Sequence, residues 1–235
     1  MTGRLQVVVS CEHASAAIPP ELGDLGLPLA VRRSHRAFDR GALGVARRLA
    51  RALRVPLHAG EWSRLVVDLN RSADARGVVP RSVDGCPIPG NDLTDAQRKR
   101  RVLDYWRPFR AAVQRAIVRA ARSGPVLHLS VHSFTPELRG VVRANDLGLL
   151  CDPARPREVE LVEALRGGLA ASGLSVRRNF PYFGDTDGFT SFVRQHLPAK
   201  RYCGLEIECN QRVVGTPAGE RRVASALLAA LRIVR

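Results

Sequence analysis

The chain has 235 residues, and its 37 lysines and arginines outnumber its 22 aspartates and glutamates, which gives a formal charge of +15. Hydrophobic residues make up 45% of the sequence, enough for a buried core, so a disordered chain is excluded. No stretch approaches 18 apolar residues, and the N-terminus lacks the features of a signal peptide. Five widely spaced cysteines without a C-x-x-C pair favour a cytoplasmic protein with no membrane partner.

The positive charge has two interpretations. A charge of this size is typical of proteins that bind nucleic acid or another polyanion. The only lysines are Lys99 and Lys200, so 35 of the 37 basic residues are arginine, which indicates a compositional habit of the source genome. Aromatic residues make up 5% of the chain, poor material for stacking bases. We therefore expect no nucleic-acid partner and keep an arginine-rich nucleic-acid-binding protein as the alternative of a different class.

The first half of the chain predicts strands, one helix and a long loop. Short apolar runs predict strands at residues 5–10, 55–61 and 65–69, and the apolar spacing of residues 42–53 predicts a helix. Residues 70–93 are rich in glycine, proline and aspartate, which predicts a long functional loop. Thr94 and Gln97 form a capping-box pattern that begins a helix ending near Ser123. Trp106 and Phe109 lie on the apolar stripe of this helix and are interpreted as core.

The second half alternates strands and helices. Strands are predicted at residues 126–132, 147–151, 175–177 and 202–208, and helices at 157–171, 189–196 and from Thr216-Pro217 to Val234. Such alternation is typical of an α/β protein with a mixed, mostly parallel sheet covered on both faces. We see no repeat, linker or low-complexity segment, so we expect a single three-layer α/β/α domain over residues 1–235.

Polar residues gather where the predicted strands end, which is where α/β folds bind ligands. The four strand ends carry Cys11-Glu12-His13, Asp68-Leu69-Asn70-Arg71, His132-Ser133 and Glu208-Cys209-Asn210. Each of these groups alone is more often structural: a satisfied histidine, a local ion pair between Asp68 and Arg71, or a turn asparagine. Glu206 and Glu208 share one face of an apolar strand, and buried carboxylates are costly unless paired or liganded. The joint occurrence of all these polar groups at the strand ends favours a functional site.

Two histidines and a carboxylate can hold Zn²⁺ and leave a fourth position for water, whose pKa falls to about 7. A further glutamate can move the proton of that water, and arginine can stabilise an oxyanion or bind a substrate carboxylate. This chemistry is metal-assisted hydrolysis of acidic acyl-amino acids. The chain lacks H-E-x-x-H, G-x-S-x-G, P-loop and G-x-G-x-x-G motifs. A Cys11 nucleophile ranks low, because it leaves Arg64, Arg71 and Glu208 without a role.

Several blocks resemble the N-formylglutamate amidohydrolase (deformylase) family, which is similar to the zinc-dependent aspartoacylase and carboxypeptidase group. The resemblance extends from Val7 to Gln211 and rests on VVVSCEHASAAIPPEL, SHRAFDRGALGVARRLA, SRLVVDLNRS, LSVHSFTP, GDTDGFTSFVR and LEIECNQ. The most specific block is SRLVVDLNRS, whose core, an arginine six residues before Asn-Arg, is shared with the aspartoacylases. The resemblance implies a phosphorylase/hydrolase-like, zinc-carboxypeptidase-like fold.

The resemblance also implies the roles of individual residues. His13 and His132 would be zinc ligands. The carboxypeptidase relatives have a glutamate three residues after the first histidine, but Ala16 stands there, so we expect Asp39 as the third ligand and keep Glu12 as its alternative. Four other positions match groups that handle the substrate. Glu208 matches the catalytic glutamate, Arg64 the arginine that polarises the scissile carbonyl, Asn70 and Arg71 the pair that binds a substrate carboxylate, and Arg194 would hold a second carboxylate.

The sequence thus predicts a cytoplasmic amidohydrolase with one Zn²⁺ per chain that acts on a small anionic N-acyl amino acid such as N-formylglutamate. Three alternatives stay open within or beside this hypothesis. The chain could be a related N-acyl amino acid deacylase, a carboxypeptidase-like hydrolase with another substrate, or a degenerate family member without metal.

Overall fold

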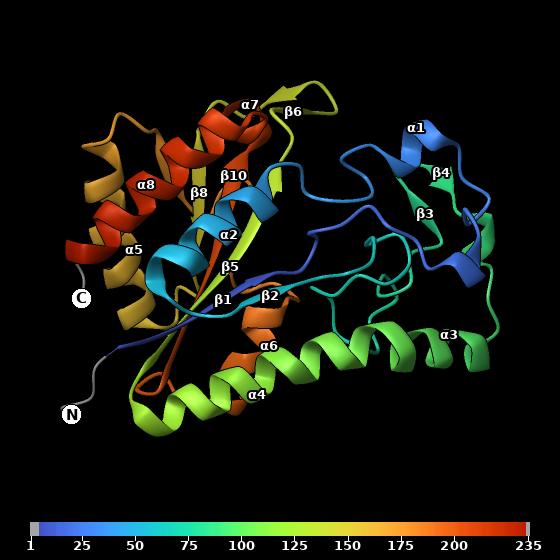
Figure 1. Cartoon of the computed structure of the whole chain (residues 1–235), viewed down its shortest axis with the longest axis horizontal. Helices are drawn as coiled ribbons and strands as arrows, with labels where there is room; N and C mark the ends of the chain where they lie inside the picture. The colour runs from blue at the N-terminus through green and yellow to red at the C-terminus, as the bar shows by residue number, and fades with distance from the viewer. Residues whose placement is uncertain (1–4, 234–235) are drawn as a thin grey trace.

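A six-stranded sheet forms the centre of the molecule in the computed structural model, which describes residues 5–233 (Figure 1). The strand order is β2-β1-β5-β10-β8-β9. The strands are β1 (Gln6–Cys11), β2 (Leu57–Ala59), β5 (Val126–Phe134), β8 (Leu147–Leu150), β9 (Val176–Arg178) and β10 (Tyr202–Asn210). Neighbours from β2 to β10 are parallel, whereas β8 runs antiparallel to β10 and parallel to β9. The predicted mixed, mostly parallel sheet is confirmed.

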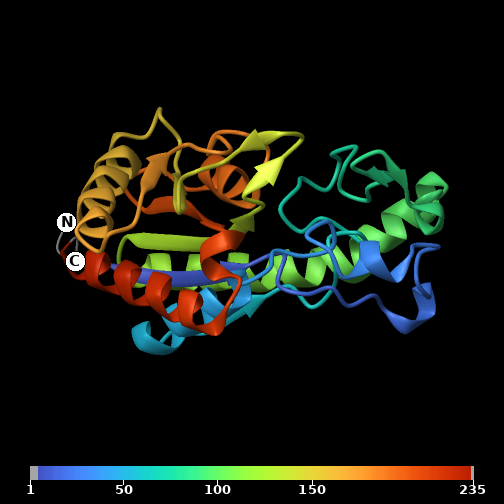
Figure 2. The ribbon, with the colours of Figure 1, turned by 90° about the horizontal axis from the view of Figure 1, so that it is seen from above.

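Helices cover both faces of the sheet and complete the predicted three layers (Figures 1 and 2). The first face is covered by α2 (Ala42–Leu53), α5 (Pro156–Ala170) and α8 (Pro217–Ile233), and the second by α4 (Arg107–Ser123) and α6 (Phe189–His196). The helix α2 has the predicted bounds because Val45, Ala46 and Leu49 lie on one apolar face, which is buried. Val234, the predicted end of α8, lies outside the described residues.

One long helical segment passes from the sheet to an irregular lobe beside it (Figures 1 and 2). It consists of α3 (Asp95–Arg101), the π-helical turn η3 (Val102–Trp106) and α4. The predicted capping box is present: Gln97 N donates to Thr94 Oγ1, and Thr94 N donates to the Gln97 side chain. The wide turn ends two residues before Pro108, which has no N–H to continue an ordinary helical ladder.

Residues 65–69 do not form a strand, so that prediction is wrong. The segment is buried, but its backbone follows turns and bonds to other segments instead of to the sheet. Asn91 Nδ2 donates to Leu65 O at 2.7 Å, and Arg110 Nη1 donates to Leu69 O at 3.0 Å. An apolar run predicts burial, and here buried side-chain donors satisfy the carbonyls that a sheet would otherwise pair.

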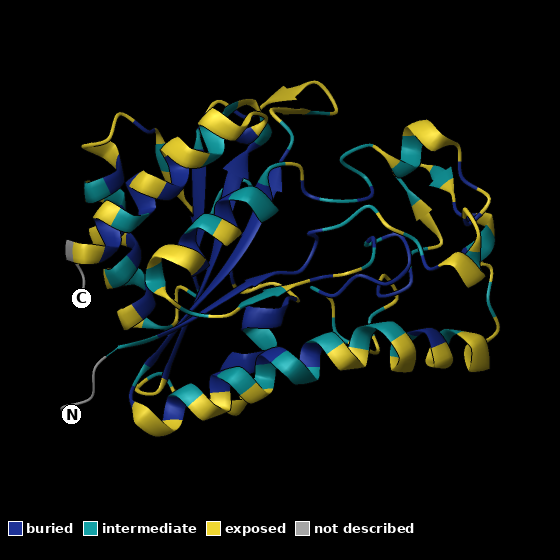
Figure 3. Ribbon diagram, in the orientation of Figure 1, coloured by how far each residue is buried: buried dark blue, intermediate teal, exposed yellow. Residues whose placement is uncertain are grey.

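The lobe and the loops contain short elements only. These are η1 (Pro20–Leu22), α1 (Leu29–Arg32), η2 (Pro89–Asn91), α7 (Gln211–Val214), the hairpin of β3 (Ser82–Val83) and β4 (Cys86–Pro87), and the hairpin of β6 (Glu137–Leu138) and β7 (Val141–Val142). Burial is densest in β5 and β10, the two strands at the middle of the sheet, as Figure 3 shows. No helix in the described part of the chain is long and apolar enough to cross a membrane.

Candidate active site

The candidate site lies at the carboxyl edge of the three central parallel strands. The strand β1 ends at Cys11, so Glu12 and His13 lie just beyond it. On the neighbouring strands, His132 of β5 is in register with Glu208 of β10. Because parallel strands end at the same edge of a sheet, residues far apart in sequence meet there.

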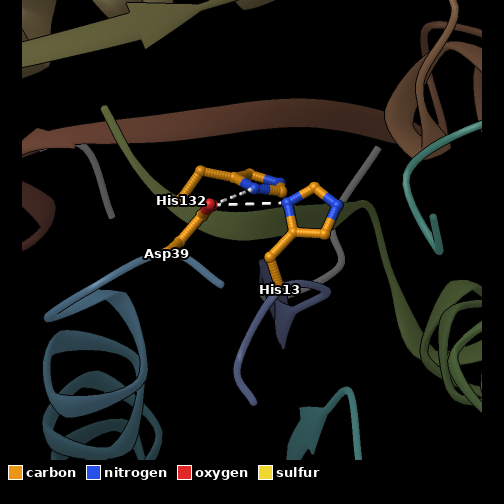
Figure 4. Close-up of side chains that lie close together, drawn as sticks. All are labelled: His13, Asp39 and His132. Atoms are coloured by element: carbon orange, nitrogen blue, oxygen red, sulfur yellow. Dashed lines mark hydrogen bonds and ion pairs between the residues drawn. The ribbon is translucent and has the colours of Figure 1, made fainter. Parts of the chain in front are cut away.

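His13, Asp39 and His132 form a buried cluster at this edge (Figure 4). Asp39 Oδ2 lies 3.3 Å from His13 Nδ1 and 3.0 Å from His132 Nδ1. Asp39 precedes α2, and its backbone N–H donates to His13 O at 2.9 Å, which holds the two residues together. The two histidines and the carboxylate that the sequence grouped therefore share one centre.

The other nitrogen of each histidine ring contacts a further carboxylate. His13 Nε2 lies 2.7 Å from Asp68 Oδ1, and His132 Nε2 lies 3.2 Å from Glu12 Oε2. Glu12 is fully buried, and it also accepts hydrogen bonds from Ser10 and Ser130. A carboxylate at Nε2 favours the proton there and leaves the Nδ1 lone pair directed at the shared centre. Glu12 thus lies behind His132, outside the centre that Asp39 occupies.

The donor set of this cluster fits a zinc ion. One carboxylate oxygen and two imidazole nitrogens, all within 4.8 Å of one another, are ligands that Zn²⁺ takes. Two ligands of a tetrahedral zinc ion lie about 3.3 Å apart, given bond lengths of about 2.0–2.1 Å. The distances from Asp39 Oδ2 to His13 Nδ1 and His132 Nδ1, 3.3 and 3.0 Å, are close to that separation.

Arg64 lies beside the cluster and is anchored by Asp39 and by the neighbouring Asp68. Its Nη2 is 2.9 Å from Asp68 Oδ2, and its Nη1 is 3.4 Å from Asp39 Oδ1. Burial opposes the charged form, but Asp68 and Asp39 outweigh it and raise the pKa of the Arg64 guanidinium. The side chain remains 31% exposed, so a fixed cation faces the cavity next to the cluster.

Glu208 lines the site from β10 and has a raised pKa. Burial raises it to about 8, with neighbouring carboxylates adding to the effect. Its Oε2 is buried without a hydrogen-bond partner among the described residues. Glu206, on the same face of β10, instead accepts a hydrogen bond from Thr190 Oγ1 at 2.7 Å. A raised carboxyl pKa near neutrality suits a group that accepts and returns a proton.

Asn70 and Arg71 lie beside the cluster, in a turn that is held in place by segments distant in sequence. Asn70 Oδ1 accepts from Phe189 N at 2.8 Å, and Arg71 Nη1 donates to Asp187 O at 3.2 Å. The helical segment supplies two further bonds, from Arg110 to Leu69 O and from Trp106 Nε1 to Arg71 O. The sequence placed Trp106 in the core only, and no local pattern indicated that helix donors would hold this turn.

Two cavities meet at the cluster. The first, named the Arg71 cavity, has a volume of about 250 Å³ and is lined by the cluster, Asn70, Arg71, Glu206 and Glu208. The second, named the Arg36 cavity, has about 260 Å³ and extends toward His35, Arg36, Asp84, Phe134 and Leu138. Both are lined by Asp39, Arg64, Asp68, Ser133 and Tyr182. Tyr182 was not singled out as an individual site residue, because no motif marks it within its loop; the fold places it between the two cavities.

The structure does not bring Arg194 to either cavity. Its guanidinium is buried against Glu158, with Nη2 3.0 Å from Glu158 Oε2, and donates to the carbonyls of Gly184 and Gly204. All its nitrogens have protein partners, so a second substrate carboxylate has no free donor there. The expectation for Arg194 is therefore corrected to a structural role.

Two other residues lie away from the shared centre. Cys11 is fully buried in the apolar core, and burial with nearby carboxylates raises its thiol pKa well above the usual value, which disfavours a nucleophile. His128 is bonded to Ser10 Oγ at 2.7 Å and to the Tyr202 hydroxyl at 2.8 Å, so both nitrogens of its ring have structural partners. Asp68 pairs with His13 and Arg64, so the purely structural alternative of a local ion pair between Asp68 and Arg71 does not apply.

A mostly parallel α/β sheet with a histidine–carboxylate cluster and an adjacent cation at its carboxyl edge is the framework of a hydrolytic enzyme. The chain belongs to the N-formylglutamate amidohydrolase family, whose sequence model matches residues 5–214, and it is an amidohydrolase. This confirms the family resemblance inferred from the sequence blocks.

Two solved structures are similar over nearly the whole chain. A gene product of Agrobacterium tumefaciens is 33% identical with a TM-score of 0.87, over 99% of this chain and 91% of that one. An N-formylglutamate amidohydrolase from Ralstonia eutropha is 25% identical with a TM-score of 0.75, over 99% of this chain and 95% of that one. No curated protein matches this sequence.

Proposed function

We propose that this chain is a zinc-dependent amidohydrolase that cleaves the amide of an N-formyl or similar N-acyl acidic amino acid such as N-formylglutamate. The observation that carries the proposal is the shared contact of Asp39 with the Nδ1 atoms of His13 and His132. Each of these histidines has a carboxylate behind it at Nε2, the arrangement that orients metal-ligating imidazoles. We therefore assign His13, Asp39 and His132 as the ligands of one zinc ion.

When bound, zinc supplies the Lewis acidity that activates water and polarises the scissile carbonyl. The side chains around it divide the remaining work. Glu208 takes the proton of the attacking water and returns it to the leaving nitrogen, a task suited to its raised pKa of about 8. Arg64 stabilises the negative charge that develops on the carbonyl oxygen, since its own charge is fixed beside the cluster.

The substrate's amino-acid half is held in the Arg71 cavity. Arg71 can bind a carboxylate through its planar fork, and Asn70 supplies a further polar contact beside it. The family supports an N-acyl amino acid as substrate. Water adds across the amide: the acyl carbon gains the hydroxyl group, the nitrogen gains the proton, and an acid and a free amino acid result. Unpaired cysteines support the cytoplasmic location that we include in the proposal.

The proposal is tested with two matched histidine variants. Purified protein loaded with zinc is assayed for metal content and for formate release from N-formyl-L-glutamate. His132→Ala is expected to lose both metal and activity, because it removes a ligand. His196→Ala is the control, because His196 is exposed on α6 and its ring, among the described residues, hydrogen-bonds only to Phe192 O. A His132→Ala protein that keeps full zinc content and activity would contradict the assignment.

A further inference from the structure

The Arg36 cavity has no assigned occupant in the proposed reaction. It is about as large as the Arg71 cavity, 260 against 250 Å³, and opens from the same cluster. Its lining combines an arginine and a histidine with the apolar side chains of Phe134 and Leu138. A lined cavity beside reacting groups is the kind of space that holds part of a substrate.

The position of Glu208 shows which half of an amide would enter each cavity. Glu208 lines the Arg71 cavity and is not among the residues that line the Arg36 cavity. A group that protonates the leaving nitrogen must lie within hydrogen-bond reach of it. The amino-acid half therefore lies in the Arg71 cavity. Arg64, at the scissile carbonyl, lines both cavities, so the acyl substituent is directed into the Arg36 cavity.

A formyl group cannot use this space. Its carbonyl carries only a hydrogen atom on the acyl side, whereas the Arg36 cavity measures about 260 Å³, several times the ~30 Å³ of one water molecule in the liquid. A longer acyl chain would reach into the cavity and gain contacts there with Phe134 and Leu138. The volume therefore favours a substrate that extends beyond formyl.

Arg36 determines the polarity of the far part of the cavity. Its Nε donates to Asp84 Oδ2 at 3.0 Å, and Asp84 also lies 3.6 Å from His35 Nε2. Asp84 is thus shared by two basic groups, and the terminal nitrogens of Arg36 have no hydrogen-bond acceptor among the residues that the structure describes. A guanidinium with free terminal N–H groups, 33% exposed beside a cavity, is a binding group for a carboxylate.

We propose that the Arg36 cavity is an acyl subsite and that the enzyme prefers N-acyl amino acids whose short acyl chain ends in a carboxylate. This inference rests on the proposed function. The reaction is the same hydrolysis: water breaks the C–N bond, the acyl carbon leaves as the second carboxylate of a dicarboxylic acid, and the amino acid leaves with the proton on its nitrogen.

The test compares three glutamate derivatives on the zinc-loaded enzyme: N-formyl, N-butyryl and N-succinyl. Butyryl and succinyl have the same four-carbon chain, and only succinyl ends in a carboxylate. We expect kcat/KM for succinyl to exceed that for butyryl by about 10- to 100-fold, the range of a charge-assisted hydrogen bond. Arg36→Met is expected to abolish this ratio.

The control is Arg33→Met, which removes the same charge from an exposed neighbour outside both cavities and should preserve the ratio. Succinate binding, measured by calorimetry, should weaken in Arg36→Met and not in Arg33→Met.

Equal rates for succinyl and butyryl, or a ratio that persists in Arg36→Met, would overturn the subsite. The subsite would also be overturned if Arg36→Met changed the preference for glutamate over glutamine in the amino-acid half of the substrate. If no derivative is hydrolysed, the proposed function itself fails; turnover of the formyl derivative alone refutes only the subsite.

Discussion

Glu12 offers the sharpest test of how the cluster is organised, because it contacts a proposed ligand without being one. Its carboxylate lies 3.2 Å from His132 Nε2 and accepts from Ser10 and Ser130, each at 2.7 Å. Burial alone would raise the pKa of Glu12, but His132 outweighs it and lowers the pKa well below the usual value, so Glu12 is ionised. Glu12→Gln keeps the size of the side chain and removes the charge behind His132.

The expected magnitude follows from this geometry. His132 Nε2 lies 2.9 Å from Ser130 Oγ and 3.2 Å from Glu12 Oε2, and Ser130 in turn donates to Glu12. Glu12→Gln removes the charge behind this network and leaves one acceptor oxygen for its donors, so the hold on His132 is weakened. Loss of such a partner behind a metal-ligating histidine costs about 10- to 100-fold in metal affinity. This corresponds to about 1.4–2.7 kcal/mol in the free energy of zinc binding.

The assay is zinc binding in competition with a chromophoric chelator, on protein shown by circular dichroism to be folded. Glu206→Gln is the matched control, since Glu206 is buried at the same edge of the sheet but contacts Thr190 and Asn70 in place of a histidine. We expect weaker zinc binding in Glu12→Gln and wild-type binding in Glu206→Gln. Equal zinc affinity in both variants would refute the positioning role of Glu12.

Three further outcomes are expected. Glu208→Gln should lower kcat by about 10²- to 10⁴-fold and keep its zinc, as seen by formate release and metal analysis; metal loss would contradict its role as a base. Arg110→Met should lower the free energy of unfolding in urea by about 1–3 kcal/mol and raise KM, since Leu69 O loses its donor, whereas the exposed Arg119→Met should change neither. Burial lowers the pKa of His128 to about 4, so as the pH falls the unfolded chain takes up this proton before the folded one does. The free energy of unfolding should therefore fall by roughly 3 kcal/mol between pH 6.5 and pH 4, and an unchanged slope of that free energy against pH in His128→Asn would contradict this.

Much of the sheet was predictable because its strands are short apolar runs and its helices carry clear apolar faces. The predicted helix at Ala42–Leu53 matches α2, and the predicted strand ends bring His132 and Glu208 into register. The exception is residues 65–69, whose apolar run could mark either a strand or a buried turn. Side chains from distant segments, Asn91 and Arg110, decide between the two, and no local pattern reveals them.

The site was predictable in its residue types and less so in its contacts. The family resemblance favoured Asp39 as the third ligand and left Glu12 as an alternative, and the fold then places Asp39 Oδ2 beside two Nδ1 atoms and Glu12 behind one ring. Arg194 lies in a block that resembles the family, yet its partner Glu158 lies 36 residues away in sequence. The sequence identifies side chains that are chemically capable of binding or catalysis, whereas the partner that each of them contacts depends on tertiary packing.

The arginine excess that first suggested a polyanion partner is used in part to hold irregular backbone. Arg98 donates to the carbonyls of Ala75, Arg76 and Val79, and Arg155 donates to those of Tyr202, Arg194 and Leu197. A guanidinium offers five N–H donors, so one side chain can serve several carbonyls at once. Arg98 thereby holds the loop before α3, and Arg155 joins the end of α6 to the start of β10, whereas Arg64, Arg71 and Arg36 face the two cavities.

The most direct test of the account is a zinc titration of metal-free protein with hydrolysis of N-formyl- and N-succinylglutamate followed at each step. We expect activity to rise in proportion to zinc and to level off at one equivalent per chain, and we expect His13→Ala, Asp39→Ala and His132→Ala to show no such rise. Activity that does not depend on zinc, or zinc binding that survives in all three variants, would contradict it.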